Sequence, residues 1–506
     1  MTITEIGFDN EKYLKEQSEY IIERAKNFDN KLYLEFGGKL IFDYHASRVL
    51  PGYDPNVKMR LLQRLKDQLG IVICIYSGDI ERGKLRADFG ITYDVGALKM
   101  IDDINDWDLK VRAVVITRYN GQPSVDLFMN KLKRRNIPVY THYEIKGYPT
   151  DVDRIVSDEG YGKNTYIEID DPIVVVTAPG PGSGKMATCL SQVYHEHKRG
   201  IHSGYAKFET FPIWNLPLKH PVNVAYESAT ADLGDFNQVD PFHLDAYNEK
   251  AVNYNRDVEV FPVVKRIVSK IMGSDMVYKS PTDMGVNRAG FAITNDAAVQ
   301  VAAKQELIRR YFRYRCEYAM GVTDKHTVER AELLMKEMGL SETDREVVTP
   351  ARKAAQLGEK HGKGHNGVFC GAAIELKNHK IVTGKNSKLM HASSSLILNA
   401  IKELASIPDE IDLLSLNLIE SIGFLKQDIF ETSQISLDLS ETLIALSISA
   451  TTNPTAKVAM EKLKELRQCE IHITHIPTPG DEAGLRKLGV NITSEPNFST
   501  KQLFIS

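Results

Sequence analysis

The sequence has few cysteines and no long apolar run, and both shortages narrow the class of protein. Its five cysteines lie far apart and form no Cys-x-x-Cys pair. This spacing argues against a disulfide framework and is typical of reduced core thiols in a cytosolic protein. No apolar run approaches the length of a membrane span, and the N-terminus, rich in Glu, Asp and Lys, has no signal-peptide core. We therefore expect a cytoplasmic protein with no membrane partner.

An excess of charge of one sign is also missing. The formal net charge is only −4, so no basic surplus favours nucleic acid as a partner. The apolar fraction of 42% and the charged fraction of 26% are typical of a globular chain. We find no internal repeat and no low-complexity tract. At 506 residues the chain is too long for one ordinary core, and several domains are expected.

The most informative segment is a glycine-rich loop between a predicted strand and a predicted helix. The apolar run Ile173 to Thr177 leads into Ala-Pro-Gly-Pro-Gly-Ser-Gly-Lys185, and a helix-like run from Met186 to His197 follows. In this order, loop N–H groups converge on an anion, the helix N-terminus adds its dipole, and the lysine supplies a charge. The sequence therefore predicts a phosphate-binding loop, with the contacts Gly180, Gly182, Ser183, Gly184, Lys185 and Thr188.

The loop departs from the standard Walker A spacing. Pro179 stands where the first glycine is usual, and Met186 replaces the Ser or Thr that binds Mg²⁺. Thr177, Ser183 and Thr188 are the nearby hydroxyls that can substitute. A tight strand-to-helix turn that binds nothing is the alternative, and the sequence leaves it open.

A phosphoryl-transfer site also needs an acid at the end of a neighbouring strand to hold Mg²⁺. Residues 223–227 read as a short strand, so Glu227 is the candidate acid and Asp232 the second choice; an ordinary solvated acid is the alternative. Lys207 and Arg288 are candidate phosphate contacts, provided that they converge on Lys185. The expected cofactor is ATP or another nucleotide with Mg²⁺.

A second cluster, Asp43-Tyr-His-Ala-Ser-Arg48, follows a strand predicted at 40–44. Asp43 and His45 are candidates for acid–base catalysis. In the alternative interpretation, Asp43 and Ser47 cap a turn and Arg48 pairs with a carboxylate.

Alternating elements in the first part of the chain predict an α/β fold with a mainly parallel, doubly wound sheet. Ligands of such sheets bind at the carboxyl ends of the strands. The strands are expected at residues 31–36, 71–76, 111–117, 139–142 and 173–177. The chain is divided into a P-loop-like α/β phosphate-binding domain at 1–240, a helical middle region at 241–360 and a C-terminal α/β domain at 361–506.

Several segments together resemble a bacterial family known as domain of unknown function 1846. The resemblance runs the full length of the chain and implies a nucleotide-binding-like N-terminal part, a helical middle and a C-terminal domain similar to the cytidine deaminase fold. Members have been labelled ATP-dependent peptidases, but the sequence shows no protease constellation. The segments are Gly7–Lys12, Leu34–Gly38, Asp43–Arg48, the glycine loop and Thr474–Gly484.

The deaminase-like part is similar to its family in the order of a hairpin followed by a helix that begins His-Ala. Ser393 stands at the place of the proton-shuttling glutamate, and Cys469 is the only later cysteine. Zinc-dependent deamination and a structural zinc are therefore not expected. The same fold also serves metal-free transformylase chemistry on a purine-type substrate. For such a role the candidate C-terminal ligand site is Lys385, Asn386, His391, His475 and Asp481.

Three functions follow from these patterns. The leading hypothesis is an enzyme for phosphoryl or related group transfer, in which Lys185 and the loop amides neutralise charge on a phosphorylated small molecule. The second is a non-catalytic ligand-binding regulatory protein, favoured by Met186 and Ser393. The third is a metal-free transferase that uses the C-terminal domain. In each case a homo-oligomer, dimer or tetramer, is expected.

Overall fold

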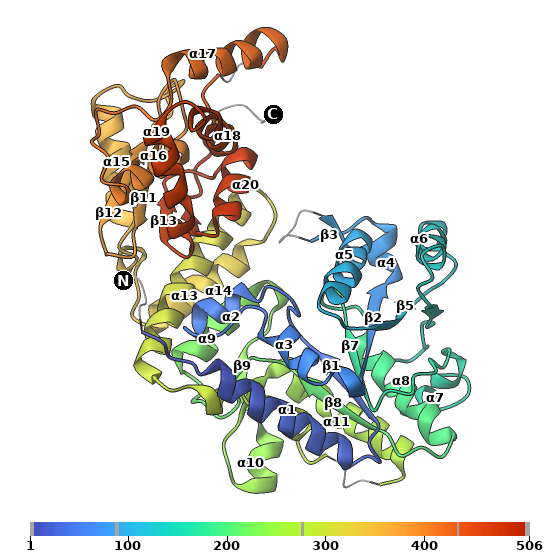
Figure 1. Ribbon diagram of the computed structural model, residues 1–506. Coiled ribbons are helices and arrows are strands. Elements are labelled where there is room, and N and C mark those ends of the chain that lie inside the picture. Colours follow the sequence, from blue (N-terminus) through green and yellow to red (C-terminus); the bar gives the residue numbers. More distant parts are fainter. Residues whose placement is uncertain (1–4, 87–90, 275–277, 433–434, 501–506) are drawn as a thin grey trace. The chain divides into compact units, whose positions relative to one another are not determined.

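The computed structural model describes residues 5–86, 91–274, 278–432 and 435–500, and the chain divides into two compact units (Figure 1). The sheet unit comprises Glu5–Glu227 and Asp235–Ala303. The C-terminal unit comprises Ser228–Gly234 and the chain from Lys304 onward. In these described ranges no helix combines the length and the apolarity that crossing a membrane requires.

A six-stranded sheet with every neighbouring pair parallel forms the centre of the sheet unit. Its strand order is β6-β5-β2-β7-β1-β8. The strands are β1 (Leu32–Phe36), β2 (Leu69–Tyr76), β5 (Val111–Thr117), β6 (Val139–Thr141), β7 (Ile173–Thr177) and β8 (Gly204–Phe208). The predicted α/β class, with a mainly parallel sheet, is confirmed.

The central strands form because their residues are apolar and mostly β-branched, the composition of strands that are covered on both faces. All five residues of β1 and of β7 are buried, and so are the first seven of the eight residues of β2. Helices provide the cover: α8 (Lys185–Lys198) packs against β1, β7 and β8, and α5 (Tyr93–Asp106) packs against β2 and β5 (Figure 1).

The remaining elements of the sheet unit surround this core. Two short antiparallel pairs are β3 (Leu85–Arg86) with β4 (Ile91–Thr92), and β9 (Asn237–Val239) with β10 (Val252–Tyr254). The further helices are α1 (Asn10–Lys26), α2 (Tyr44–Val49), α3 (Val57–Arg64), α4 (Ser77–Glu81), α6 (Pro123–Lys133), α7 (Val152–Ile155), α9 (Pro221–Ala229), α10 (Pro241–Tyr247), α11 (Asn255–Met272), α12 (Pro281–Met284) and the start of α13 (Asp296–Ala319).

The C-terminal unit is built on a four-stranded sheet in the order β12-β11-β13-β14. Strand β11 (Gly371–Glu375) pairs antiparallel with β12 (Ile381–Lys385) and with β13 (Glu470–Ile473), and β14 (Asn491–Ser494) lies parallel to β13. The predicted hairpin is thus confirmed. The helices of this unit after α13 are α14 (Lys325–Glu337), α15 (Val348–Lys360), α16 (Ala392–Leu404), α17 (Leu416–Phe424), α18 (Leu439–Ser449), α19 (Pro454–Glu461) and α20 (Pro479–Leu488).

Two predicted strands are wrong. Residues 223–227 lie inside helix α9, because Pro221 begins the helix and the Asn223 side chain is fixed to the backbone of Ile213 by two hydrogen bonds. Residues 40–43 form no strand, because Phe42 has a φ of 55° and Asp43 caps helix α2. The structure divides into two units, and the predicted division into three domains, with a helical middle region, stays a prediction.

Candidate functional site

The glycine loop leaves the carboxyl end of β7, which lies between β2 and β1 in the sheet (Figure 1). Helix α8 begins at Lys185, one residue after the loop ends. Gly182 and Gly184 have φ values of 69° and 86°, a left-handed conformation that glycine adopts without steric cost. Gly184 is the N-cap of α8 and provides no side chain to bond the first helical amides. The predicted order of strand, glycine loop and helix is confirmed.

The loop carbonyls are held by strand β5 and the residue after it. The Thr117 hydroxyl donates to the carbonyl oxygen of Ser183 at 2.8 Å, and the Arg118 guanidinium donates to that of Gly182 at 2.6 Å. In a trans peptide the C=O and the next N–H point in opposite directions. The N–H groups of Ser183 and Gly184 are therefore turned away from Thr117 and Arg118.

No protein acceptor takes up these N–H groups. Within the described ranges, the amides of Gly182 to Met186 make no hydrogen bond to backbone or side chain, whereas Thr188 bonds normally to the Gly184 carbonyl at 2.9 Å. Unpaired amides at a helix N-terminus form a natural anion site, because they add donors to the positive end of the helix dipole. A phosphate-binding role for this loop stays a prediction.

Hydroxyl groups line the base of the loop. The Thr177 and Ser183 side chains are 0% and 3% exposed, and in the described part of the chain their oxygens have no hydrogen-bond partner. A buried hydroxyl without a partner costs free energy unless a ligand or water satisfies it. The Thr188 hydroxyl is already engaged, since it accepts a bond from the Cys74 thiol at 3.4 Å. Thr177 and Ser183 therefore have more free hydrogen-bonding capacity for a ligand than Thr188, whose role as a contact stays a prediction.

Lys185 is the cation of the site. Its side chain is partly buried, and among the residues that the structure describes it makes no ion pair or hydrogen bond. Other lysines of the unit are paired: Lys58 with Asp43 at 2.9 Å and Lys207 with Asp257 at 2.6 Å. The Lys185 ammonium is thus available to a ligand.

The acid that lies nearest the loop along the sheet is Glu35. Strand β1 is the parallel neighbour of β7, and Glu35 stands beside Val176, one residue before the loop strand ends. Glu35 is 7% exposed, and its Oε2 accepts a bond from the Tyr205 hydroxyl at 2.7 Å. This residue was missed in the sequence, where the signal was present: an acid one residue before the end of an apolar strand, with Gly37-Gly38 directly after that strand.

A buried charge cluster continues from Glu35 to the end of β8. The Lys207 ammonium lies 2.6 Å from Asp257 and 3.3 Å from Glu209. Burial raises the pKa of Glu209 and outweighs Lys207 and Lys185, whose positive charges lower it. Burial lowers the pKa of Lys207, but Asp257 and Glu209 reverse this and hold it above its ordinary value. Lys207 is therefore engaged in this cluster, and its role as a phosphate contact stays a prediction.

Several other predicted site residues have structural partners. Glu227 accepts a hydrogen bond from the Asn237 amide at 3.1 Å and lies in helix α9, not at the end of a strand. Asp232, the second choice, accepts a bond from the Tyr314 hydroxyl at 3.4 Å. The prediction of a strand-end acid at 227 is therefore wrong in its position, and Glu35 holds that place.

The Asp43 cluster follows its structural alternative. Asp43 caps α2 by accepting a bond from the Ala46 amide at 3.2 Å, and it forms a buried ion pair with Lys58. Burial raises the pKa of Asp43, but Lys58 overcomes this effect and holds it below its ordinary value. His45 packs its ring against Phe211 and Tyr226. These contacts account for both residues without catalysis.

Arg288 lies in a different cavity. Its guanidinium stacks on Phe291 at 3.7 Å from the ring centre and lies 3.7 Å from Glu16. This cavity, of about 550 Å³, is lined by Tyr20, Arg24 and Trp214 among others, and does not include any residue of the glycine loop. Within the described chain, the structure thus separates Arg288 from Lys185.

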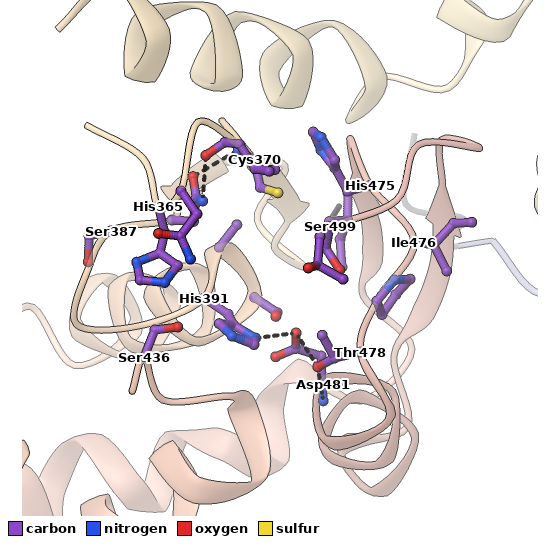
Figure 2. A pocket seen from close by; sticks show the side chains of 18 residues that line it. His365, Cys370, Ser387, His391, Ser436, His475, Ile476, Thr478, Asp481 and Ser499 are labelled. Atoms are coloured by element: carbon purple, nitrogen blue, oxygen red, sulfur yellow. Dashed lines mark hydrogen bonds and ion pairs between the residues drawn. The ribbon is translucent and has the colours of Figure 1, made fainter. Parts of the chain in front are cut away.

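Four of the five predicted C-terminal residues share one cavity of the C-terminal unit. Asn386, His391, His475 and Asp481 line it, while Lys385 at the end of β12 is not among the described residues that do so. Figure 2 shows His391 and Asp481 facing each other, joined by a hydrogen bond. The sequence pattern thus located a real concavity.

Comparisons with known proteins cover nearly the whole chain. The model named "Domain of unknown function DUF1846, N-terminal" matches residues 6–339, and its C-terminal counterpart matches residues 343–504. A "UPF0371 protein" of Clostridium botulinum (strain ATCC 19397 / Type A) is 59% identical over 500 residues, which is 99% of each chain. A "UPF0371 protein" of Clostridium tetani (strain Massachusetts / E88) is 58% identical over 500 residues, again 99% of each chain.

Proposed function

The chain belongs to the DUF1846 family, and we propose that its sheet unit binds a nucleotide at the glycine loop and transfers the terminal phosphoryl group. The observation that carries the proposal is the orientation of the loop peptides. Thr117 and Arg118 hold two loop carbonyls, and the amides beyond them have no acceptor among the residues that the structure describes. Lys185 adds a cation that no described residue pairs, so an anion is the ligand that satisfies the whole arrangement.

Glu35 is the proposed Mg²⁺-binding acid. Mg²⁺ in phosphoryl-transfer sites is held by one or two carboxylates together with phosphate oxygens and water. Glu35 stands beside the loop strand and Thr177 ends that strand, so both lie at the edge of the sheet where the loop begins. The Ser183 hydroxyl is proposed in place of the Ser or Thr that Met186 replaces, because the register puts Thr177 on the opposite face of the sheet from Glu35.

Glu209 is the proposed proton acceptor. A carboxyl whose pKa is raised toward neutrality is better suited to general base catalysis than an ordinary exposed acid. In the proposed reaction, the acceptor hydroxyl loses its proton to Glu209 and its oxygen forms a bond to the terminal phosphorus. The bond from that phosphorus to the bridging oxygen breaks, and the nucleoside diphosphate leaves with Mg²⁺ and Lys185 neutralising its charge.

Calorimetric titration with ATP, with and without Mg²⁺, tests the binding step. Lys185→Ala removes a charge-assisted contact of about 1.5–3 kcal/mol, so the affinity is expected to fall roughly 10- to 100-fold. Lys198→Ala, at the other end of the same helix and half exposed beside Asp158, is the matched control and should bind as the natural chain does. Glu35→Gln should retain ATP binding and lose most of its dependence on Mg²⁺.

Assays of phosphate release and of transfer to added acceptors test the chemical step. Turnover that falls in Lys185→Ala, Glu35→Gln and Glu209→Gln supports the enzyme. Binding without turnover would instead support the regulatory function. If the natural chain binds neither ATP, GTP nor their diphosphates, the nucleotide proposal fails.

A further inference from the structure

The cavity of the C-terminal unit contains an oriented histidine–carboxylate pair. His391 is the N-cap of helix α16, and its Nδ1 lies 2.7 Å from Oδ2 of Asp481, in the first turn of α20. The side chains of His391 and Asp481 are 19% and 6% exposed. Because Nδ1 is fixed by the carboxylate, Nε2 is the ring nitrogen left for the cavity (Figure 2).

Both carboxylate oxygens of Asp481 already accept hydrogen bonds from protein groups. Its Oδ1 accepts from the Leu439 amide at 2.9 Å, and its Oδ2 accepts from both His391 and the Thr478 hydroxyl, the latter at 2.9 Å. Asp481 is the only carboxylate among the described lining residues. Its negative charge is therefore stabilised by His391, the Thr478 hydroxyl and the Leu439 amide.

Two further histidines, His365 and His475, line the cavity. Both ring nitrogens of His365 are buried and, in the described chain, have no hydrogen-bond partner. His475 uses Nδ1 in a contact with the Thr474 hydroxyl at 3.0 Å, which leaves its Nε2. In Figure 2, His365 and His475 both lie above the His391–Asp481 pair, His365 to the left and His475 to the upper right.

The N-terminus of α16 opens at the same place. Ala392 and Ser393, its first two residues, line the cavity, and no side chain caps this helix. Ser395 bonds to the His391 carbonyl at 3.0 Å, but the amides of Ala392 and Ser393 make no hydrogen bond within the described residues. The helix dipole thus adds to the histidine nitrogens.

We propose that this cavity is a second ligand site that binds a small oxyanion, a carboxylate or a phosphate group, with His391 donating a hydrogen bond from Nε2. The cavity of about 260 Å³ is smaller than pockets that usually enclose nucleotide- or drug-sized ligands. Its occupant is a small metabolite, with its anionic group at the α16 amides and His391 and the rest against Val368, Ile473 and Ile476. This site does not depend on the glycine loop.

The surroundings of His391 favour its protonated, positively charged form, which attracts an anion. Burial lowers the pKa of His391, but Asp481 and then Asp438 outweigh this and hold it above its ordinary value, against a smaller opposing effect of Lys426. His365, across the cavity, has its pKa lowered by burial and by His391 and Lys388. Anion binding should therefore be strong while His391 is protonated and should weaken as the pH rises through the pKa of His391.

Titration with inorganic phosphate and with succinate, in the full chain carrying Lys185→Ala, tests this site without interference from the loop. His391→Gln preserves volume and removes the charge, and it should weaken the preferred anion at least about tenfold. His361→Ala is the matched control, an exposed histidine of the same unit outside the cavity. Preference for phosphate or for succinate distinguishes the two sources of the anionic group.

Proton NMR of the histidine rings provides the second readout. The signal lost in His391→Gln should titrate above the ordinary pKa of histidine, and its pKa should rise further when the anion binds. Asp481→Asn should lower the pKa of His391 while the unit stays folded. Unchanged histidine signals at millimolar phosphate and succinate, or equal affinity in His391→Gln, would overturn the proposal; loss of ATP binding at the loop would not affect it.

Discussion

Gly180 shows how closely the phosphate loop is packed at the level of single residues. A Cβ atom on Gly180 would lie 2.1 Å from the ring of Tyr93, at the start of helix α5. Real Cβ atoms do not approach a ring so closely, and either Tyr93 or the loop must move to admit one. The glycine therefore keeps the loop in the position where its amides face outward.

We predict that Gly180→Ala weakens nucleotide binding by about tenfold, because a small shift of the loop misaligns several amides together. Calorimetry with ATP and Mg²⁺ measures the change. Gly423→Ala, where a Cβ meets nothing within 4 Å, is the control and should bind normally. Equal affinity of the two variants would show that the loop position is unimportant.

Glu35 illustrates why the sequence located the loop but not the acid beside it. The strand that contains Glu35 is predictable from its apolar residues, but strand order cannot be read from a sequence, so the acid was expected after the loop. Its partner in the sheet, β7, comes about 140 residues later in the chain. Only the register of the two strands places Glu35 beside Val176.

At the scale of elements, the apolar strands were predictable and the short polar segments were not. Residues 111–117 and 173–177 were predicted within a residue of their observed bounds, since long runs of buried β-branched residues have few alternatives. Residues 223–227 include the strand formers Val224 and Tyr226, but the tertiary hydrogen bonds of the Asn223 side chain outweigh this local propensity and the segment is helical.

Strand β5 and the residue after it position the loop. The Thr117 and Arg118 bonds to the Ser183 and Gly182 carbonyls determine which way the loop amides point. We predict that Thr117→Val together with Arg118→Ala lowers ATP affinity about tenfold, since each lost bond is worth about 1 kcal/mol. Binding is measured by calorimetry and the fold by circular dichroism.

The control for this pair of substitutions is Arg112→Ala. Arg112 lies at the other end of β5, away from the loop, and its substitution removes an ion pair with Asp171. It should leave ATP binding intact. If the double variant binds ATP as tightly as Arg112→Ala does, the loop orientation does not depend on β5.

At the scale of the whole molecule, a buried arginine–glutamate network stabilises the C-terminal unit. Glu470 on β13 receives Arg309 at 2.9 Å and Arg345 at 2.5 Å, and Arg345 also donates to the carbonyl of Ile471 at 3.1 Å. Burial raises the pKa of Glu470, but the two arginines outweigh it and bring the pKa to about 2. The network connects α13 to β13.

This network predicts a pH dependence of stability. Because the folded-state pKa of Glu470 is depressed below its ordinary 4.5, its contribution is full above that pH and is lost as the pH falls toward 2. Glu470→Gln leaves Arg345 buried without a carboxylate and Arg309 with Glu306 alone, so it should lower the free energy of unfolding by about 3 kcal/mol at neutral pH. Chemical denaturation, repeated at pH values about one unit apart from pH 7 into the acidic range, measures both the pH dependence and the effect of the substitution.

Glu482→Gln is the matched control, since Glu482 and its partner Arg486 are half exposed. It should change stability by less than about 1 kcal/mol. A Glu470→Gln chain as stable as the control, with the same acid midpoint as the natural chain, would contradict the stabilising role of the network.

The central claim is that the glycine loop holds a phosphate, and a crystal structure of the full chain grown with ADP, Mg²⁺ and a phosphate analogue such as aluminium fluoride tests it most directly. We predict density for the β-phosphate at the amides of Ser183 to Lys185, with the Lys185 ammonium in contact and Mg²⁺ close to Glu35. Nucleotide density elsewhere on the chain, with the loop amides bonded only to solvent, would contradict the claim.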